Sequence, residues 1–282
     1  MTSRRLTTPV VLVLLLAYAL ITVFPLFWLL FTSLKPSQDI FLNPLKLPDP
    51  NNLAWHNLSN AWTAGHVGDY FGNSVLVTGL SVVLTLWCAA TAAYALARFA
   101  FPGARPLLFY FLAGLMVPLQ LAVIPLFFEL KALHMLGSRL GLVVVYVAIN
   151  LPFAIFVLTG FFRTLPSSLH ESALLDGCGE MRAFWHIMLP LARPGLVTVA
   201  IFTFLAVWNE YFLAFMFLSG AGSEQIRTLP LGLANIMIVS QYRTDWGMSF
   251  AGLLIITIPT LIIYVLLQRH LTKGITLGAV KG

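Results

Sequence analysis

Glu-Ser-Ala-Leu-Leu-Asp-Gly is the sequence from Glu171 to Gly177, and Ile-Met-Leu-Pro is the sequence from Ile187 to Pro190. Nine residues separate the two segments. Long apolar runs precede and follow them, so these polar and turn-forming residues interrupt an otherwise hydrophobic chain. The interruption indicates a folded loop that connects two membrane-crossing helices.

The first half of this loop predicts a short helix over about residues 169–176. Ser168 and Glu171 have the spacing of a capping box, in which a serine begins a helix and a glutamate bonds back to it. Gly177 suits the left-handed conformation that ends many helices.

The second half predicts an amphipathic helix that begins near Gly179 or Glu180. It should end before Pro190, because proline lacks the backbone N–H that a helix interior requires. Its apolar side chains follow the i, i+3, i+4, i+7 spacing of one helical face: Met181, Phe184, Trp185 and Met188. Such a face suits either an interfacial helix lying on the bilayer or a helix that enters a partner's groove.

Composition places the chain in a membrane. Of its 282 residues, 59% are hydrophobic and 9% are charged, whereas a soluble domain carries about 25% charged residues. Backbone groups in hydrocarbon must bond within their own segment, so apolar runs of roughly 20 residues are helices. We predict an all-α integral membrane protein with six transmembrane helices: Val10–Phe31, Val75–Ala97, Leu107–Phe128, Leu140–Phe162, Leu196–Leu218 and Met248–Leu267. The first run is too long for a signal peptide and is expected to remain as an anchor.

The chain divides into three expected parts. Residues 1–70 comprise the first transmembrane helix and a turn-rich outer segment, in which Trp55, Trp62 and Tyr70 suit the headgroup level. Residues 71–270 form the helical core and include the loop at 164–194, and residues 271–282 form a tail. Residues 219–246 are predicted to be a second, longer outer loop.

Basic residues predict the orientation. With the N-terminus inside, ten of the 16 Lys and Arg residues fall on the inner side and six on the outer side. Both termini and the 164–194 loop are therefore expected in the cytoplasm. Anionic lipid headgroups account for the net charge of +6 without nucleic acid. Cys88 and Cys178 are expected to stay unpaired, since one lies in a span and the other in a reducing compartment.

Motifs for catalysis or metal binding are missing from the sequence. It contains no phosphate-binding G-x-x-x-x-G-K-S/T loop and no G-x-S-x-G elbow. His170-Glu171 begins like a zinc-protease motif, but position 174 is leucine. Six scattered histidines and two distant cysteines form no metal pattern. We therefore expect no catalytic residue, no metal site and no enzyme activity in this chain, which counts against an intramembrane enzyme.

The loop resembles the cytoplasmic docking loop of type I ATP-binding-cassette importer permeases, a family with six-helix cores. Matching positions are Glu171, Ala173, Gly177, Ile187, Leu189 and Pro190, whereas Ser172 stands where the family usually has alanine. Two further stretches resemble the carbohydrate-uptake branch, in particular its shorter, maltose-permease G-type subunit: Trp208–Ala214 and Gly274–Gly282.

This resemblance implies a permease subunit of a binding-protein-dependent sugar importer in a bacterial or archaeal cytoplasmic membrane. The implied partners are a second permease in a heterodimer, two ATP-binding-cassette ATPase subunits, an external solute-binding protein and membrane lipid. ATP and magnesium would bind to the ATPases, so no cofactor is expected in this chain. The implied docking residues are Glu171, Ser172, Ala173, Gly177, Ile187, Leu189 and Pro190. An ion channel would not need such a loop.

A di- or oligosaccharide is the expected cargo, and a glycerol-phosphate ester or another small polar solute is the alternative. No Lys or Arg lies within the six apolar runs, which favours a neutral solute over an anion. Gln120, Asn150 and Asn209 fall near the middle of three spans, where an amide needs a partner. They either bond between helices, worth about 0.6 kcal/mol each, or border a sugar path. Glu210, the one acid inside a span, is either a paired core carboxylate or part of a water-filled gate.

Overall fold

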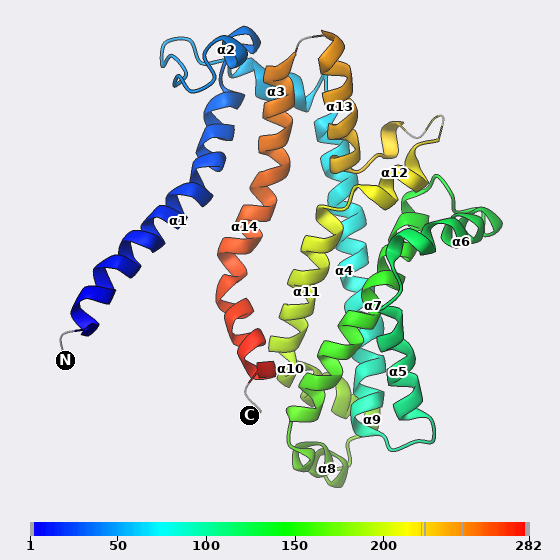
Figure 1. Cartoon of the computed structure of the whole chain (residues 1–282). Coiled ribbons are helices and arrows are strands. Elements are labelled where there is room, and N and C mark those ends of the chain that lie inside the picture. Colours follow the sequence, from blue (N-terminus) through cyan, green and yellow to red (C-terminus); the bar gives the residue numbers. More distant parts are fainter. Residues whose placement is uncertain (1–2, 221, 223, 244, 280–282) are drawn as a thin grey trace. The chain divides into compact units, whose positions relative to one another are not determined.

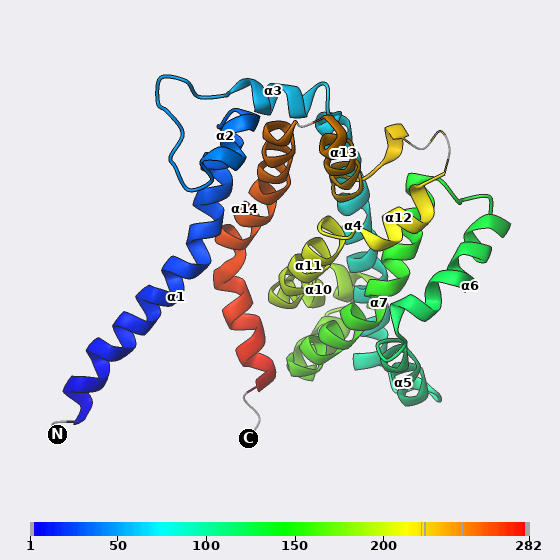
Figure 2. The ribbon, with the colours of Figure 1, turned by 45° about the horizontal axis from the view of Figure 1, so that its top comes forward.

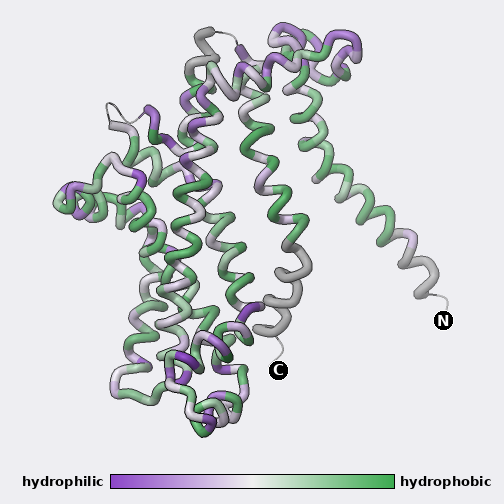
Figure 3. Tube along the Cα trace, turned by 180° about the vertical axis from the view of Figure 1, so that it is seen from behind, coloured by the Kyte–Doolittle hydropathy of each residue, from purple (hydrophilic) through white to green (hydrophobic). Residues whose placement is uncertain are grey.

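The computed structural model describes residues 3–220, 222, 224–243 and 245–279 (Figure 1). Helices are the only regular secondary structure in this part of the chain, which confirms the all-α prediction. The chain packs into two compact units: residues 1–68 with 232–258, and residues 69–231 with 259–282. Figure 3 shows hydrophobic residues along the long helices and hydrophilic residues concentrated in their connections.

The first unit holds a long N-terminal helix and a folded connection. Helix α1 spans Ser3–Ser33, α2 spans Ser37–Leu42 and α3 spans His56–Trp62. Most of α13 (Leu229–Arg243) and the first part of α14 (Trp246–Ala279) belong to the same unit. None of the membrane-length window of α1 is buried within the chain.

The second unit carries the remaining helices. It contains nearly all of α4 (Val67–Arg98), followed by α5 (Ala104–Gly114), α6 (Leu119–Ala132) and α7 (Arg139–Thr164). Then come α8 (Ser167–Leu175), a second short helix in three parts, α11 (Arg193–Trp208) and α12 (Phe212–Leu218). Two apolar clusters form its core, one around α7 and α12 and one around α4, α7 and the 164–194 loop.

Among the described residues, four helices are long and apolar enough to cross a membrane, and up to six spans result if each of two bent pairs counts as one. The expected third span is broken: α5 and α6 meet at 101° (Figure 2). Pro118 lies at the break with an extended backbone (ψ 124°) and immediately precedes α6. A proline cannot donate the bond that would continue the preceding helix, which explains the position of the break.

The expected fifth span is also broken. Helix α11 ends at Trp208, and α12 begins only at Phe212. Helix α12 packs against α6 and α7 instead of extending α11. The other bent pair joins the short helix of the 164–194 loop to α11 at 73°. Apolar composition alone does not distinguish a straight span from two short helices. Pro118 marks the break in the third span, whereas the apolar residues do not mark the break in the fifth.

Two predictions about the connections are wrong. Residues 219–246 are not a loop, because α13 occupies most of them; Pro230 lies in its first turn, where a missing N–H costs nothing. Tyr70 is buried, so it cannot lie among lipid headgroups, although Trp55 and Trp62 are exposed. The C-terminal stretch continues α14 as far as Ala279, and residues 280–282 lie outside the described residues.

A buried amide holds the connection after α1 in place. Asn57 of α3 donates from Nδ2 to the carbonyl oxygens of Ser33 (2.9 Å) and Lys35 (2.8 Å). The Lys35 amine in turn donates to the carbonyls of Asn43 and Pro44, at 3.1 Å each. The bond to Ser33 satisfies a carbonyl at the end of α1 that has no partner within the helix, and the other three satisfy carbonyls of the connection that follows.

Replacing Asn57 with leucine should lower the stability of the first unit. The variant leaves two buried carbonyls without a donor, which costs about 1–3 kcal/mol. Asn60→Leu is the matched control, because Asn60 lies on the same short helix with an exposed side chain. Thermal unfolding of the purified protein measures the difference. Equal melting temperatures for the two variants would contradict the role assigned to Asn57.

Candidate functional site

The 164–194 loop begins with α8, which starts two residues earlier than predicted. Pro166 is the residue before the helix, and no side chain caps the helix there. Ser168 therefore lies inside the first turn, and the predicted capping box with Glu171 is wrong. The extended backbone of Pro166 (φ −57°, ψ 133°) sets the entry of the chain and displaces serine from the capping position.

The end of α8 matches its prediction. Gly177 has a φ of +83°, in the left-handed region. Its N–H bonds to the carbonyl of Leu174 (3.0 Å), and the N–H of Cys178 bonds to that of Ala173 (3.0 Å). These two bonds form a Schellman motif, which satisfies the last carbonyls of the helix. Glycine is suited to this position because a side chain is strained at positive φ.

The second short helix runs past Pro190, contrary to prediction. It consists of α9 (Glu180–Ala183), the π-turn η1 (Phe184–Met188) and α10 (Leu189–Leu191). In η1 the N–H of Leu189 bonds to the carbonyl of Phe184, five residues earlier. This wider turn lies immediately before the proline, where a regular α-turn would bring the ring against the preceding carbonyl. The helix therefore continues to Leu191.

The side chains predicted to share one apolar face do not all face the core. Phe184 and Met188 are buried, whereas Met181 is 69% exposed and Trp185 is at the border of exposure. The predicted single apolar face is thus divided between the interior and the surface. The spacing rule assumed 3.6 residues per turn, and a π-turn does not follow it.

The predicted docking residues occupy both sides of this loop. Ala173 is buried, Ile187 and Leu189 are half-buried against the core, and the remaining four are exposed: Glu171, Ser172, Gly177 and Pro190. Large apolar side chains lie exposed beside them: Leu169, Leu174, Leu175, Met181 and Leu191. Exposed apolar side chains that gather in a polar loop are typical of a protein-binding surface.

Neither of the two asparagines predicted to border a path joins two helices through its Nδ2 group. Asn150 donates to the carbonyl of Tyr146 (2.8 Å) and Asn209 to that of Leu205 (2.9 Å), each one turn back in its own helix. Gln120 is exposed in the first turn of α6, directly after the break. The exposed amides of Gln120 and Asn209 remain candidates for contact with a polar solute.

Glu210 is a paired carboxylate at the break between α11 and α12. It accepts a hydrogen bond from the Tyr146 hydroxyl (2.6 Å) and from the backbone N–H groups of Leu213 (2.7 Å) and Ala214 (3.1 Å). The carboxylate thereby caps the first turn of α12, whose N–H groups have no partner within the helix. The sequence showed the lone acid but not Tyr146, which no motif marks.

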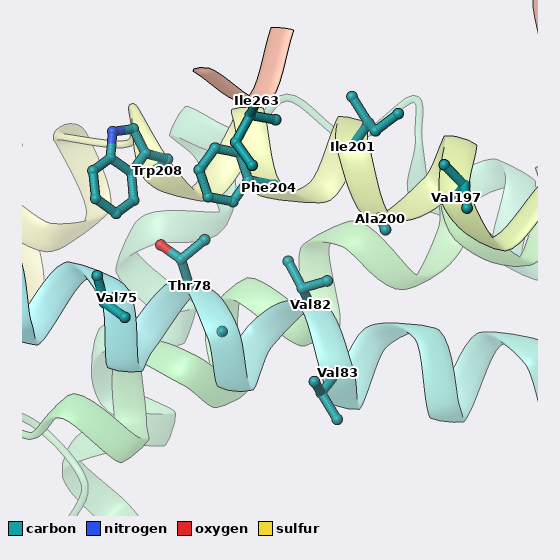
Figure 4. Close-up of a pocket in the computed structure, with 11 residues that line it drawn as sticks. Val75, Thr78, Val82, Val83, Val197, Ala200, Ile201, Phe204, Trp208 and Ile263 are labelled. Carbon is teal, nitrogen blue, oxygen red and sulfur yellow. The ribbon is translucent and has the colours of Figure 1, made fainter. Parts of the chain in front are cut away.

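A groove of about 490 Å³ lies between α4 and α11 (Figure 4). Its lining is apolar apart from the Thr78 hydroxyl and the Trp208 indole N–H. None of the predicted path residues lines it. The groove therefore suits hydrocarbon better than sugar hydroxyls, and it gives no support to a sugar site there. No cluster of three metal-ligating side chains occurs among the described residues.

Comparison with known proteins agrees with this geometry. The family described as "binding-protein-dependent transport system inner membrane component" matches residues 81–277. A permease protein of a diacetylchitobiose uptake system, NgcG of Streptomyces coelicolor, is 40% identical over 94% of this chain and 86% of its own length. The trehalose transport system permease SugB of Mycobacterium tuberculosis is 35% identical over the full length of both chains.

A solved structure has the same fold. A bacterial ABC transporter that imports the acidic polysaccharide alginate superposes with a TM-score of 0.81, at 22% identity, over 95% of this chain and 98% of its own.

Removing the Glu210 carboxylate should destabilise the α11–α12 break. Glu210→Ala loses three hydrogen bonds to the group, two of them from helix-terminal N–H groups, and we expect a loss of about 2 kcal/mol. Asn209→Leu is the control, because the Asn209 side chain bonds only one turn back, to the carbonyl of Leu205, and a loss of about 0.6 kcal/mol or less is expected. Thermal unfolding of the two purified variants measures the difference in stability between them. If Asn209→Leu proves as damaging as Glu210→Ala, the capping role is wrong.

Proposed function

Since the chain belongs to the family of inner membrane components of binding-protein-dependent transport systems, we propose that it carries a di- or oligosaccharide as one permease subunit of an ATP-driven importer. The observation that carries this proposal is the 164–194 loop, in which Gly177 orients an exposed helix between two membrane helices. A transporter that did not use an ATPase would have no need of this projecting apolar surface.

The exposed face of the loop is the proposed ATPase contact. Glu171 and Ser172 lie on α8 with Leu174 and Leu175, so acidic, small and apolar groups share one short helix. An amphipathic helix of this kind suits a groove on a partner protein. Two ATPase subunits would hold ATP and magnesium and perform the hydrolysis, and this chain would have no catalytic role.

Two other proteins complete the proposed assembly. A second permease would form the other half of the pore, as a heterodimer with this chain. An external solute-binding protein would deliver the cargo near residues 219–246, on the side of the membrane opposite the 164–194 loop. Both termini and the loop would then lie in the cytoplasm. This orientation agrees with the excess of basic residues on the side predicted to be the inner one.

Neutral sugar is the proposed cargo for two reasons. Relatives that match more than nine-tenths of this chain are named for diacetylchitobiose and trehalose uptake. The apolar runs contain no Lys or Arg that would attract a phosphate or carboxylate group within the membrane. Asn209 and Gln120, with exposed side chains, and half-buried Asn150 are the proposed path residues.

Gly177→Val should abolish most transport while the protein still inserts. Valine at positive φ costs about 1–2 kcal/mol and would displace the end of α8. Gly179→Val is a matched control two residues away: its φ of −70° suits valine, and neither position has an atom within 4 Å of an added Cβ. Uptake and ATPase activity of the assembled importer measure the effect.

The docking assignment would be wrong if Gly177→Val transported normally with full ATPase stimulation. Equal loss in both valine variants would also count against it, because a side chain alone would then explain the effect.

Leucine at Gln120, Asn150 or Asn209 should reduce sugar uptake or change its selectivity. Leucine keeps the approximate size and removes the hydrogen bonds that hydroxyl groups require. Uptake of radiolabelled trehalose, diacetylchitobiose and glycerol 3-phosphate, compared with thermal stability, separates cargo contact from structural support. An unchanged cargo profile in all three variants would refute the path, and preferential uptake of glycerol 3-phosphate by the unmodified importer would refute the sugar assignment.

A further inference from the structure

Tyr94, near the end of α4, contacts three short segments of the 164–194 loop, α8, α9 and η1, as well as the end of α7. Its side chain is buried, and its ring centroid lies 4.8 Å from that of Phe184 in η1 and 5.6 Å from that of Phe162 in α7. The ring of His170 in α8 meets it edge-on at 6.0 Å. The Tyr94 hydroxyl donates to Glu180 Oε2 in α9 at 3.5 Å.

Two of these partners also bond to each other. His170 Nε2 and Glu180 Oε2 lie 2.8 Å apart, so the Glu180 carboxylate joins α8 to α9 and both of them to α4. The His170 side chain is mostly buried, whereas the Glu180 side chain is 48% exposed. This hydrogen-bonded set of Tyr94, His170 and Glu180 is called the α4 clasp below.

Further contacts come from the same face of α4. Arg98 donates to the carbonyls of Phe162 (2.8 Å) and Leu165 (2.7 Å), where the chain leaves α7 for the loop. Trp87 lies 5.2 Å from Trp185 of η1, measured between ring centroids. Positions 87, 94 and 98 are seven and four residues apart, which places them on one helical face.

Chain connectivity does not explain this attachment. The loop is covalently joined to α7 and α11, while α4 precedes it by more than sixty residues. Helix α4 nevertheless meets the loop through aromatic packing, a carboxylate and a guanidinium. It also forms one wall of the apolar groove opposite α11 (Figure 4). If the loop were displaced and α4 moved with it, the movement would therefore extend through the length of α4 within the second unit.

We propose that the α4 clasp makes α4 move with the 164–194 loop when the ATPases act, and that Tyr94, His170 and Glu180 are positioning residues for transport. This inference rests on the proposed ATPase contact. The clasp is stiff where it packs on aromatic rings and adjustable where it is hydrogen-bonded, because Glu180 is partly solvated. Weakening the hydrogen bonds should leave the resting protein folded and disconnect α4 during the ATP-driven change.

The test measures one distance in the importer assembled with its partner subunits. Cys88 and Cys178 are replaced by serine, and spin labels are placed at Ser168 of α8 and Leu84 of α4, two exposed positions outside the proposed ATPase contact. Double electron–electron resonance spectroscopy then gives the distance between the two labels at rest and after trapping with ATP and vanadate. The variants are Glu180→Gln and Tyr94→Phe, which keep shape, and the controls are Glu129→Gln and Tyr110→Phe, at exposed positions on α6 and α5.

Without substitution, the distance should be the same in both states. In Glu180→Gln and Tyr94→Phe it should be unchanged at rest, and a second distance should appear on trapping. The ratio of displaced to native population should rise about three- to tenfold, because losing the net contribution of one hydrogen bond changes an equilibrium constant by about that factor. The controls should behave like the unsubstituted importer. A merely structural role would instead alter the resting distance or the assembly.

Three results would overturn the inference. The unsubstituted distance could shift on trapping, which would mean that α4 does not follow the loop. Both clasp variants could match the controls in both states, which would mean that the hydrogen bonds do not connect the elements. In either case a trapped complex still supports the ATPase contact. If no ATPase assembles or traps nucleotide, the proposed function itself fails and this inference fails with it.

Discussion

Hydrogen bonding of the backbone in an apolar environment is the constraint on which this structure depends. A continuous helix meets it without help, as α4 and α7 do over most of their length. Wherever a helix stops inside an apolar run, the chain must supply a substitute. The carboxylate of Glu210 does so at the start of α12, and Pro118, immediately before α6, has no N–H that needs a partner. Both broken elements are thus compatible with burial in protein or with membrane depth.

The same constraint gives the 164–194 loop its two different ends. On one side, Gly177 ends α8 with a complete Schellman motif, so the chain can turn without leaving carbonyls unpaired. On the other side, a π-turn lets the second short helix continue through Pro190 and reach α11. One end of the loop depends on backbone freedom and the other on a wider helix. Side chains from α4 then fix the orientation of the whole loop.

Features of the fold that depend on neighbouring residues could be predicted from the sequence, whereas features that depend on residues far away in the chain could not. Apolar runs predicted the long helices because burial in hydrocarbon acts on every residue of a run, and Gly177 was predictable because its conformation is local. The break after Trp208 was not predictable, since the residues on both sides are equally apolar, whereas the break after Gly114 has a local signal in Pro118, which cannot continue a helix. Tyr146 and Tyr94 acquire their roles from partners more than sixty residues away. Sequence spacing does not reveal which distant residues will come into contact.

Helix α1 illustrates a different relation between sequence and structure. The chain holds it at one end, where Thr32, Ser33 and Leu34 are buried, and none of its apolar window is buried in the subunit. Its insertion energy therefore comes from composition and not from matched packing within this chain. Along most of its length one apolar residue can replace another at little cost in stability. The residues at its buried end cannot be replaced so freely, because they pack against the rest of the chain. Evolution of this helix should accordingly conserve hydropathy and length while individual identities turn over.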